Sequence, residues 1–126
     1  MNEPEWLGLA EVLRIHARQL AVFGGPSGLR DQGALESALG RPQHRWAYEQ
    51  PDMAELGAAY AFGIARNHPF IDGNKRTAFV SARVFLGLNG INLQAAQEDV
   101  VATILALAAG ELSEVELAAV IRERWT

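Results

Sequence analysis

The chain has 126 residues, of which 49% are hydrophobic and 21% are charged, and this size and composition predict one globular domain over residues 1–126. Eleven basic and fifteen acidic residues give a net charge of −4, which argues against broad non-specific binding to the phosphates of nucleic acids. No cysteine occurs, so a disulfide framework, a thiolate nucleophile and a zinc-thiolate site are excluded.

The N-terminal segment resembles neither a signal peptide nor a membrane anchor. Its first residues are acidic and no uninterrupted apolar h-region follows them. No stretch of the chain approaches the roughly eighteen consecutive apolar residues of a membrane span. We therefore expect a cytoplasmic protein that does not contact a membrane.

A first helix is predicted near the N-terminus by apolar residues at steps of four and three. The residues of this stripe are Trp6, Ala10, Leu13, Ala17 and Leu20. The sequence "GGPSG" at 24–28 should end this helix. His16 lies between two arginines of the same segment, and we expect it to be a surface or boundary histidine, or else a partner contact.

The next segment, "LRDQGALESALGRP", predicts a short second helix. This helix should run from about Asp31 to Leu39, because Gly40 and Pro42 follow and both residues disfavour a helix interior. The arginine- and aromatic-rich stretch after Pro42 is accordingly predicted to be a loop.

Two further helices flank the most unusual part of the sequence. Asp52 and Glu55 have the spacing of a capping box, and helical periodicity continues from there to about Asn67. The segment from Lys75 to Leu88 is apolar on nearly all sides, which predicts a buried central helix ended by the "NG" at 89–90.

The remainder of the chain is also predicted to be helical. Glu98 to Ala109 is apolar at helical spacing, and Ser113 with Glu116 forms a second capping box for a last helix that runs toward Trp125. No segment alternates with a period of two for long enough to indicate a strand. The predicted fold is all-α, with about six helices.

The stretch "NHPFIDGNKRTAF" at 67–79 joins two of these helices and is dense in reactive groups. Gly73, Asn74 and Lys75 should lie at the N-terminus of a helix, where unpaired backbone N–H groups and the helix dipole favour an anion such as phosphate. Lys75 and Arg76 would add a mobile charge and a planar guanidinium to that site.

Two side chains in the same turn suggest a reaction at the bound phosphate. Asp72 is a candidate ligand for magnesium, which bridges a carboxylate to phosphate oxygens. His68 is placed to accept a proton from an attacking hydroxyl, and Phe70 is expected to anchor the turn in the core. A structural alternative remains for each residue, because Asp72 could simply cap the helix and the cations could form a solvated face.

The segment resembles the signature of the Fic superfamily, HxFx[D/E]GNGRxxR, and its variant HxFx[D/N][A/G]NKR in the Doc-like branch. The matching residues are His68, Phe70, Asp72, Gly73, Asn74 and Arg76. Lys75 replaces the second glycine of the Fic signature, and Phe79 replaces its last arginine. Both departures agree with the Doc-like branch.

The resemblance implies a toxin of a type II toxin–antitoxin system that acts as an ATP- and magnesium-dependent protein kinase. His68 would be the general base toward a threonine of translation elongation factor Tu, and Asp72 would hold magnesium. Gly73, Asn74, Lys75 and Arg76 would bind the phosphates, and translation would be arrested.

The same resemblance implies control by a separate protein. Self-inhibited Fic enzymes carry a helix with the pattern [S/T]xxxE[G/N], but no serine or threonine in this chain has a glutamate four residues later. A Phd-type antitoxin, bound as a helix in a groove, is therefore the expected partner. Two alternatives stay open: an AMP transferase that uses the same site, and a catalytically silent helical module that binds a partner.

Overall fold

The computed structural model describes residues 2–126, and every regular element in that part of the chain is a helix. The helices are α1 (Leu9–Phe23), α2 (Gln32–Tyr48), α3 (Met53–Asn67), α4 (Asn74–Leu88), α5 (Gln97–Ala108) and α6 (Glu114–Arg124). The predicted all-α fold with six helices is confirmed. No helix within residues 2–126 has the length and apolar character needed to cross a membrane.

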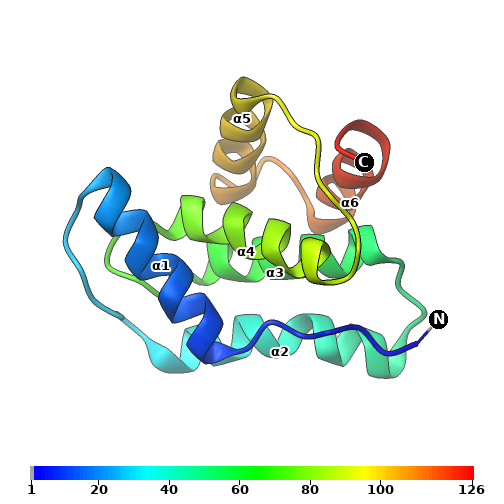
Figure 1. The fold of residues 1–126 in the computed structure, drawn as a ribbon, viewed down its shortest axis with the longest axis horizontal. Coiled ribbons are helices and arrows are strands. Elements are labelled where there is room, and N and C mark those ends of the chain that lie inside the picture. The colour runs from blue at the N-terminus through cyan, green and yellow to red at the C-terminus, as the bar shows by residue number, and fades with distance from the viewer. Residues whose placement is uncertain (1) are drawn as a thin grey trace.

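Helix α3 lies at the centre of the fold and contacts α2, α4, α5 and α6 (Figure 1). Ten of its fifteen residues are buried, against seven of fifteen in α4. Helix α4, expected to be the buried central helix, does pack between α1, α3 and α5, but it is less buried than α3. Helix α4 leaves Phe79 and Val80 half-buried along a cleft, whereas α3 is surrounded by other helices.

Both predicted capping boxes are formed. At the start of α3 the Asp52 side chain accepts from the Glu55 N–H at 2.8 Å, and the Glu55 side chain accepts from the Asp52 N–H at 3.1 Å. Ser113 and Glu116 make the equivalent pair of bonds at the start of α6. These caps satisfy backbone donors that have no partner within the helix, so they fix where the two helices begin.

Helix α2 does not end at Leu39 as predicted but continues through Gly40 and Pro42 to Tyr48. Pro42 has no N–H to donate within the helix, yet its side chain is buried and the turn beyond it is held by tertiary contacts. Trp46 packs edge to face on Trp6, with ring centroids 6.4 Å apart. Packing of the last turns against neighbouring elements thus outweighs the local helix-breaking signal.

Helix α1 buries a different face from the one predicted. Its buried residues are Val12 and His16, whereas Leu13 of the predicted stripe is 36% exposed. Trp6 precedes the helix and stacks on Phe85, with the rings 5.9 Å apart. The predicted stripe lies one residue out of phase with the buried positions Val12 and His16, and its first member, Trp6, lies before the helix.

Tyr60 attaches the segment before α1 to the core at Leu7. The Tyr60 hydroxyl of α3 accepts from the Leu7 N–H at 2.9 Å and donates to the Leu7 carbonyl at 3.1 Å. Tyr60 and Leu7 are both buried, and burial raises the pKa of Tyr60 to about 12. The hydroxyl therefore stays protonated and pairs both backbone groups of Leu7, which no helix or strand would otherwise satisfy.

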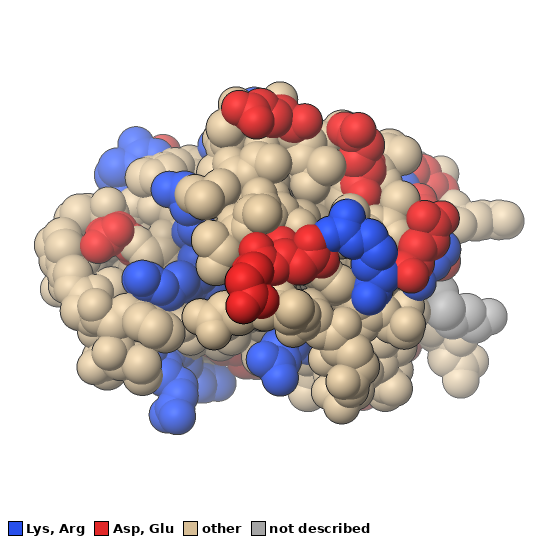
Figure 2. Space-filling model, turned by 90° about the horizontal axis from the view of Figure 1, so that it is seen from above, with Lys and Arg blue, Asp and Glu red and all other residues tan. Residues whose placement is uncertain are grey.

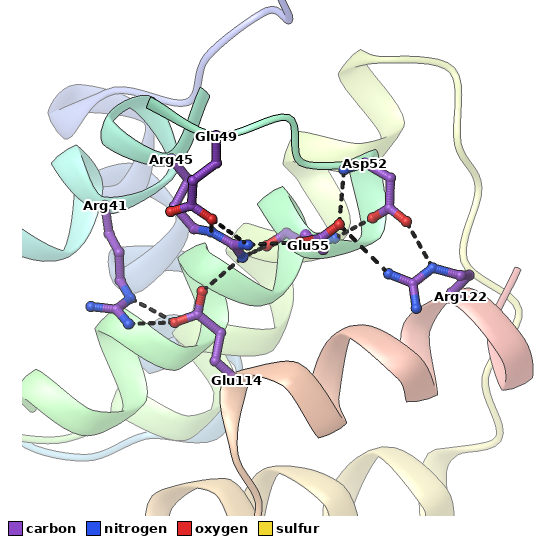
Figure 3. Close-up of polar contacts among 7 residues, drawn as sticks. All are labelled: Arg41, Arg45, Glu49, Asp52, Glu55, Glu114 and Arg122. Carbon is purple, nitrogen blue, oxygen red and sulfur yellow. Dashed lines mark hydrogen bonds and ion pairs between the residues drawn. The ribbon is translucent and has the colours of Figure 1, made fainter. Parts of the chain in front are cut away.

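Ion pairs join α2, α3 and α6 (Figure 3). Arg45 of α2 donates to Glu55 of α3 at 2.7 Å and to Glu114 of α6 at 3.1 Å. Arg122 of α6 pairs with Asp52 at the start of α3, at 2.8 Å. The side chains of Arg45 and Glu114 are only 18% and 12% exposed, so these pairs are less screened by water than the Arg122 pair.

The residue after α6 connects the end of the described chain to α5. Trp125 is 2% exposed, and its indole N–H donates to the Asp99 carboxylate of α5 at 2.6 Å. The backbone carbonyl of Trp125 accepts from the Gln94 N–H, also at 2.6 Å. Its ring meets Phe79 of α4 edge to face, so Trp125 holds α5 and α4 in a fixed relation.

Candidate active site

Residues 68–73, called the reactive turn below, connect the end of α3 to the start of α4. A residue with left-handed backbone conformation lies at each end of this turn. His68 is the C-cap of α3, with φ 51° and ψ 55°, and Gly73 is the N-cap of α4, with φ 80° and ψ 13°. Glycine adopts this conformation without a steric penalty. His68 does not share that freedom, so its conformation must be held by its surroundings.

A ring of two hydrogen bonds closes the middle of the turn. The Asn74 side chain accepts from the Phe70 N–H and donates to the Phe70 carbonyl, both at 2.9 Å. Asn74 is 3% exposed and Phe70 is 1% exposed. Because the Asn74 amide is used within the turn, only its backbone N–H is left to face a ligand.

Beneath the turn lies His16 of α1, which is 6% exposed. Its ring stacks on Phe70, with centroids 3.7 Å apart and planes 7° from parallel. Its Nε2 is 2.8 Å from the Asp72 carbonyl oxygen and donates to it. The expectation of a surface or boundary histidine was therefore wrong: His16 supports the turn that carries the reactive side chains.

The segment between α1 and α2 supports the other side of the turn. Leu29 forms an isolated antiparallel bridge with Phe70, and the Ile71 N–H donates to the Gly28 carbonyl at 3.1 Å. The Arg30 N–H donates to the Pro69 carbonyl at 2.7 Å. Residues about 40 positions earlier in the chain thus fix the turn by backbone pairing.

The start of α4 offers an anion site. The first helical bond of α4 is donated by the Thr77 N–H to the Gly73 carbonyl at 3.0 Å, so the N–H groups from Gly73 to Arg76 precede the helical ladder. Lys75 and Arg76 are exposed beside them, and the Arg76 guanidinium lies 4.2 Å from the centroid of the Phe23 ring of α1. Unpaired donors, the helix dipole and two cations together favour a phosphate here.

Asp72 is exposed at the edge of this site. A side chain at Gly25 would place its Cβ 2.4 Å from Asp72 Oδ2, so the glycine leaves the space that the carboxylate occupies. No cluster of three acidic or histidine side chains that could hold a metal occurs within residues 2–126. One carboxylate suits Mg²⁺, which takes most of its ligands from phosphates and water.

These residues share one cleft of about 750 Å³. His68, Asp72 and the start of α4 line one part of it. Arg83, further along α4, also lines the cleft. Helix α5 contributes a mostly apolar part of the lining, including Val101 and Leu105, each 51% exposed. Phe79 lies between the two, where a signature arginine would otherwise add charge.

The surface charge near the cleft differs from the average of the chain. Figure 2 shows Lys and Arg side chains toward the end of the molecule where α1 lies, and Asp and Glu mostly over its middle and opposite end. Arg83 makes no ion pair with any of residues 2–126. A chain of net charge −4 can thus still attract an anion at one end.

The fold and the turn define an all-α protein in which a turn between two packed helices presents free backbone N–H groups and two cations. A family model described as "Fic/DOC family" matches residues 6–86, and the chain belongs to that family. It is 39% identical over 113 residues to "Protein kinase doc" of Escherichia phage P1, with 89% of each chain covered. It is 44% identical over 78 residues to "Toxin Doc" of Mycolicibacterium smegmatis, a match that covers 59% of this chain and 58% of that protein.

The sequence motif located the turn but not what holds it. His16 and Arg30 are 56 and 38 positions away from the turn residues that they contact. A signal for His16 was present, because Val12, His16 and Leu20 also follow helical spacing. No sequence signal identified Arg30, because a single arginine in a loop belongs to no motif or periodic pattern that would distinguish it from other arginines.

Proposed function

We propose that this chain is a toxin of the Doc type and a protein kinase that transfers the γ-phosphate of ATP to a threonine of elongation factor Tu. The observation that carries the proposal is the turn itself. It places the exposed His68, the Asp72 carboxylate and the start of α4 along one cleft. The names of two relatives, "Protein kinase doc" and "Toxin Doc", support the same activity and biological role.

In the proposed reaction His68 is the general base. Its imidazole takes the proton of the threonine hydroxyl, and the hydroxyl oxygen bonds to the γ-phosphorus as the bond from that phosphorus to the β,γ-bridging oxygen breaks. The products are phosphothreonine and ADP. The left-handed turn at His68 directs the chain away from α3, which leaves the imidazole exposed beside the cleft rather than packed against the helix.

The phosphates would lie at the start of α4. Backbone N–H groups from Gly73 to Arg76 would donate to their oxygens, and Lys75 and Arg76 would neutralise charge on them. Asp72 would hold magnesium, which offsets phosphate charge during transfer. This arrangement supplies orientation and electrostatic stabilisation, the main contributions that a protein makes to phosphoryl transfer.

Lys75 supports transfer of the γ-phosphate rather than of AMP. Where the AMP-transferring signature has glycine, Lys75 fills space and places a cation within the phosphate site. The alternative AMP transferase would use the same residues with the nucleotide bound in the opposite direction. The position of the transferred phosphate in ATP distinguishes the two activities.

We further propose that a Phd-type antitoxin restrains the chain in trans. The chain lacks the inhibitory pattern [S/T]xxxE, and Phe79 replaces the arginine that would pair with its glutamate. An active toxin without an internal inhibitor requires an external one. A helix from the antitoxin, bound in an apolar groove, would meet that requirement.

The first experiment incubates the purified chain, magnesium and elongation factor Tu with ATP labelled at the γ- or the α-phosphate. Label is expected to reach elongation factor Tu only from the γ-position. His68→Ala should lower the rate about 10²- to 10⁴-fold, because the general base is lost. His44→Ala is the matched control, since His44 lies on α2 and does not line this cleft.

Three results would contradict the proposal. Label from the α-position would identify an AMP transferase. Full transfer by a folded His68→Ala variant would remove the general base from the mechanism. Absence of transfer from either label, together with harmless expression in bacteria without an antitoxin, would favour a silent binding module.

A further inference from the structure

His68 has a backbone conformation that its own sequence context opposes. Among residues 2–126 it is the one residue other than glycine with a positive φ. It also precedes Pro69, and a residue before proline prefers the extended region. Two local preferences therefore oppose φ 51° and ψ 55° at His68, so tertiary contacts must hold it there.

The contact that does so comes from Arg30, in the loop before α2. Arg30 Nε donates to the His68 carbonyl at 3.0 Å, and Nη2 donates to the same oxygen at 2.5 Å. Nη2 also donates to the Asn67 carbonyl at 3.2 Å. One guanidinium thus covers the last carbonyl of α3 and the carbonyl of the residue that follows it, where a cation also interacts favourably with the helix dipole.

The backbone of Arg30 is fixed as firmly as its side chain. Its N–H donates to the Pro69 carbonyl at 2.7 Å, and the next N–H, that of Asp31, donates to the same oxygen at 3.0 Å. Asp31 is the N-cap of α2, and its side chain accepts from the Ala34 N–H at 3.0 Å. Arg30 is therefore attached at both ends, to α2 through its neighbour and to His68 through its guanidinium.

Arg30 contributes little to the core. The residue is exposed and makes no ion pair with any of residues 2–126, so its removal leaves no cavity and no unpaired carboxylate. What its removal does change is the set of donors around the His68 carbonyl. We propose that Arg30 is a positioning residue that keeps His68 in its left-handed conformation, and so keeps the imidazole aligned with the substrate hydroxyl.

The proposal rests on the proposed function for one point, the role of His68 as base. It then predicts which kinetic constant changes. Arg30 makes no described contact with the start of α4, where the nucleotide would bind, so its loss should lower kcat and leave the KM for ATP unchanged. A purely structural cap would instead lower stability with kcat intact.

The kinetic test compares three variants. Arg30→Met removes every side-chain donor at nearly constant length, and kcat is expected to fall about 10²-fold, the scale associated with a small misplacement of a catalytic group. Arg30→Lys keeps the charge but not the two-nitrogen fork, and should recover part of the loss. Asp31→Ala is the matched control, because it removes the cap of α2 one residue away and should lower the melting temperature without lowering kcat.

A second measurement does not depend on activity. The Cα and carbonyl chemical shifts of His68 and its N–H to Hα coupling report its backbone conformation in solution. They should leave the left-handed range in Arg30→Met and stay within it in Asp31→Ala. If wild type transfers no phosphate, the proposed function fails, and this measurement alone then decides whether Arg30 holds His68.

Three outcomes would overturn the inference. The first is unchanged His68 shifts in Arg30→Met. The second is a changed backbone with kcat equal to that of an active wild type. The third is a fall in kcat of the same size in Asp31→Ala, which would attribute the effect to general loosening of the loop.

Discussion

At Gly63 the backbones of α2 and α3 approach more closely than a methyl group allows. A Cβ built there would lie 3.0 Å from both Cα and Cβ of Ala38 and 3.2 Å from its carbonyl oxygen. A Cβ at Gly40, two residues after Ala38 on α2, would meet nothing within 4 Å. The two glycines occupy helix interiors for different reasons, since only Gly63 is required by packing.

Gly63→Ala should destabilise the protein by about 1 to 3 kcal/mol, because the added methyl group presses on the α2 backbone, which cannot move aside easily. Gly40→Ala is the control and should stabilise it by about 0.4 to 1 kcal/mol through the unfolded chain. Urea unfolding measures both changes. Equal effects of the same sign would contradict the packing argument.

Individual site residues could be predicted from sequence only where a local motif carried them. His68, Asp72 and Lys75 belong to one short pattern, and the structure places them along one cleft; their catalytic roles stay predictions. His16 and Arg30 were not recognised as part of the site, because their contacts cross 56 and 38 positions of sequence. Such contacts depend on how the helices pack, which one sequence does not reveal residue by residue.

At the scale of elements, most helix bounds were predicted closely from local signals, and the end of α2 is the main exception. The starts of α3 and α6 are encoded by capping boxes, which are local and depend on residues three positions apart. The end of α2 was wrong because Gly40 and Pro42 are also local signals, but tertiary packing of the last turns overrides them. The predicted buried face of α1 was also wrong. Trp6 has the spacing of the predicted apolar stripe but lies outside the helix.

The cap of α3 also carries a charge whose contribution depends on pH. Burial of the Asp52 carboxylate by itself would raise its pKa, but hydrogen bonds from Arg122 and from the Glu55 N–H outweigh this, and the pKa falls below the usual 3.8. A depressed pKa means that the carboxylate stabilises the fold above the unfolded value and loses this effect as the pH falls through the folded value.

Asp52→Asn keeps an oxygen for the cap, because asparagine is also a good N-cap, but removes the charge. The variant should be less stable than wild type near neutral pH by less than about 1 kcal/mol, since the pair is exposed to solvent. The two unfolding free energies should converge as the pH falls below 3.8. A gap that persists in acid would show that the cap geometry, and not the charge, was lost; Arg122→Gln tests the partner.

At the scale of the whole molecule, the two walls of the cleft come from different parts of the chain. The reactive turn and α4 form one wall, and α5 forms the other. Helix α5 packs on α3 and α4, and Trp125 adds a further attachment through its contacts with Asp99, Gln94 and Phe79. The position of the apolar wall therefore depends on a residue that lies outside the cleft.

Trp125→Ala should lower the free energy of unfolding by about 3 to 5 kcal/mol, because a large buried side chain is removed. Hydrogen exchange should accelerate more in α5 than in α3, since α3 is held by several other helices. Tyr48→Ala is the control, as Tyr48 is 78% exposed. Uniform acceleration across all helices would show that Trp125 supports the fold as a whole and not α5 in particular.

The order of the site's segments along the chain sets the order in which the site is completed during synthesis. The ribosome makes α1, with His16, and the loop that carries Arg30 before it makes the turn from His68 to Gly73, so both supports precede the residues they hold. The α5 side of the cleft follows later, and Trp125, which contacts Asp99 of α5, follows later still. A nascent chain that has displayed the complete motif therefore still lacks the α5 side of the cleft, and the site is finished only after α5 has been made.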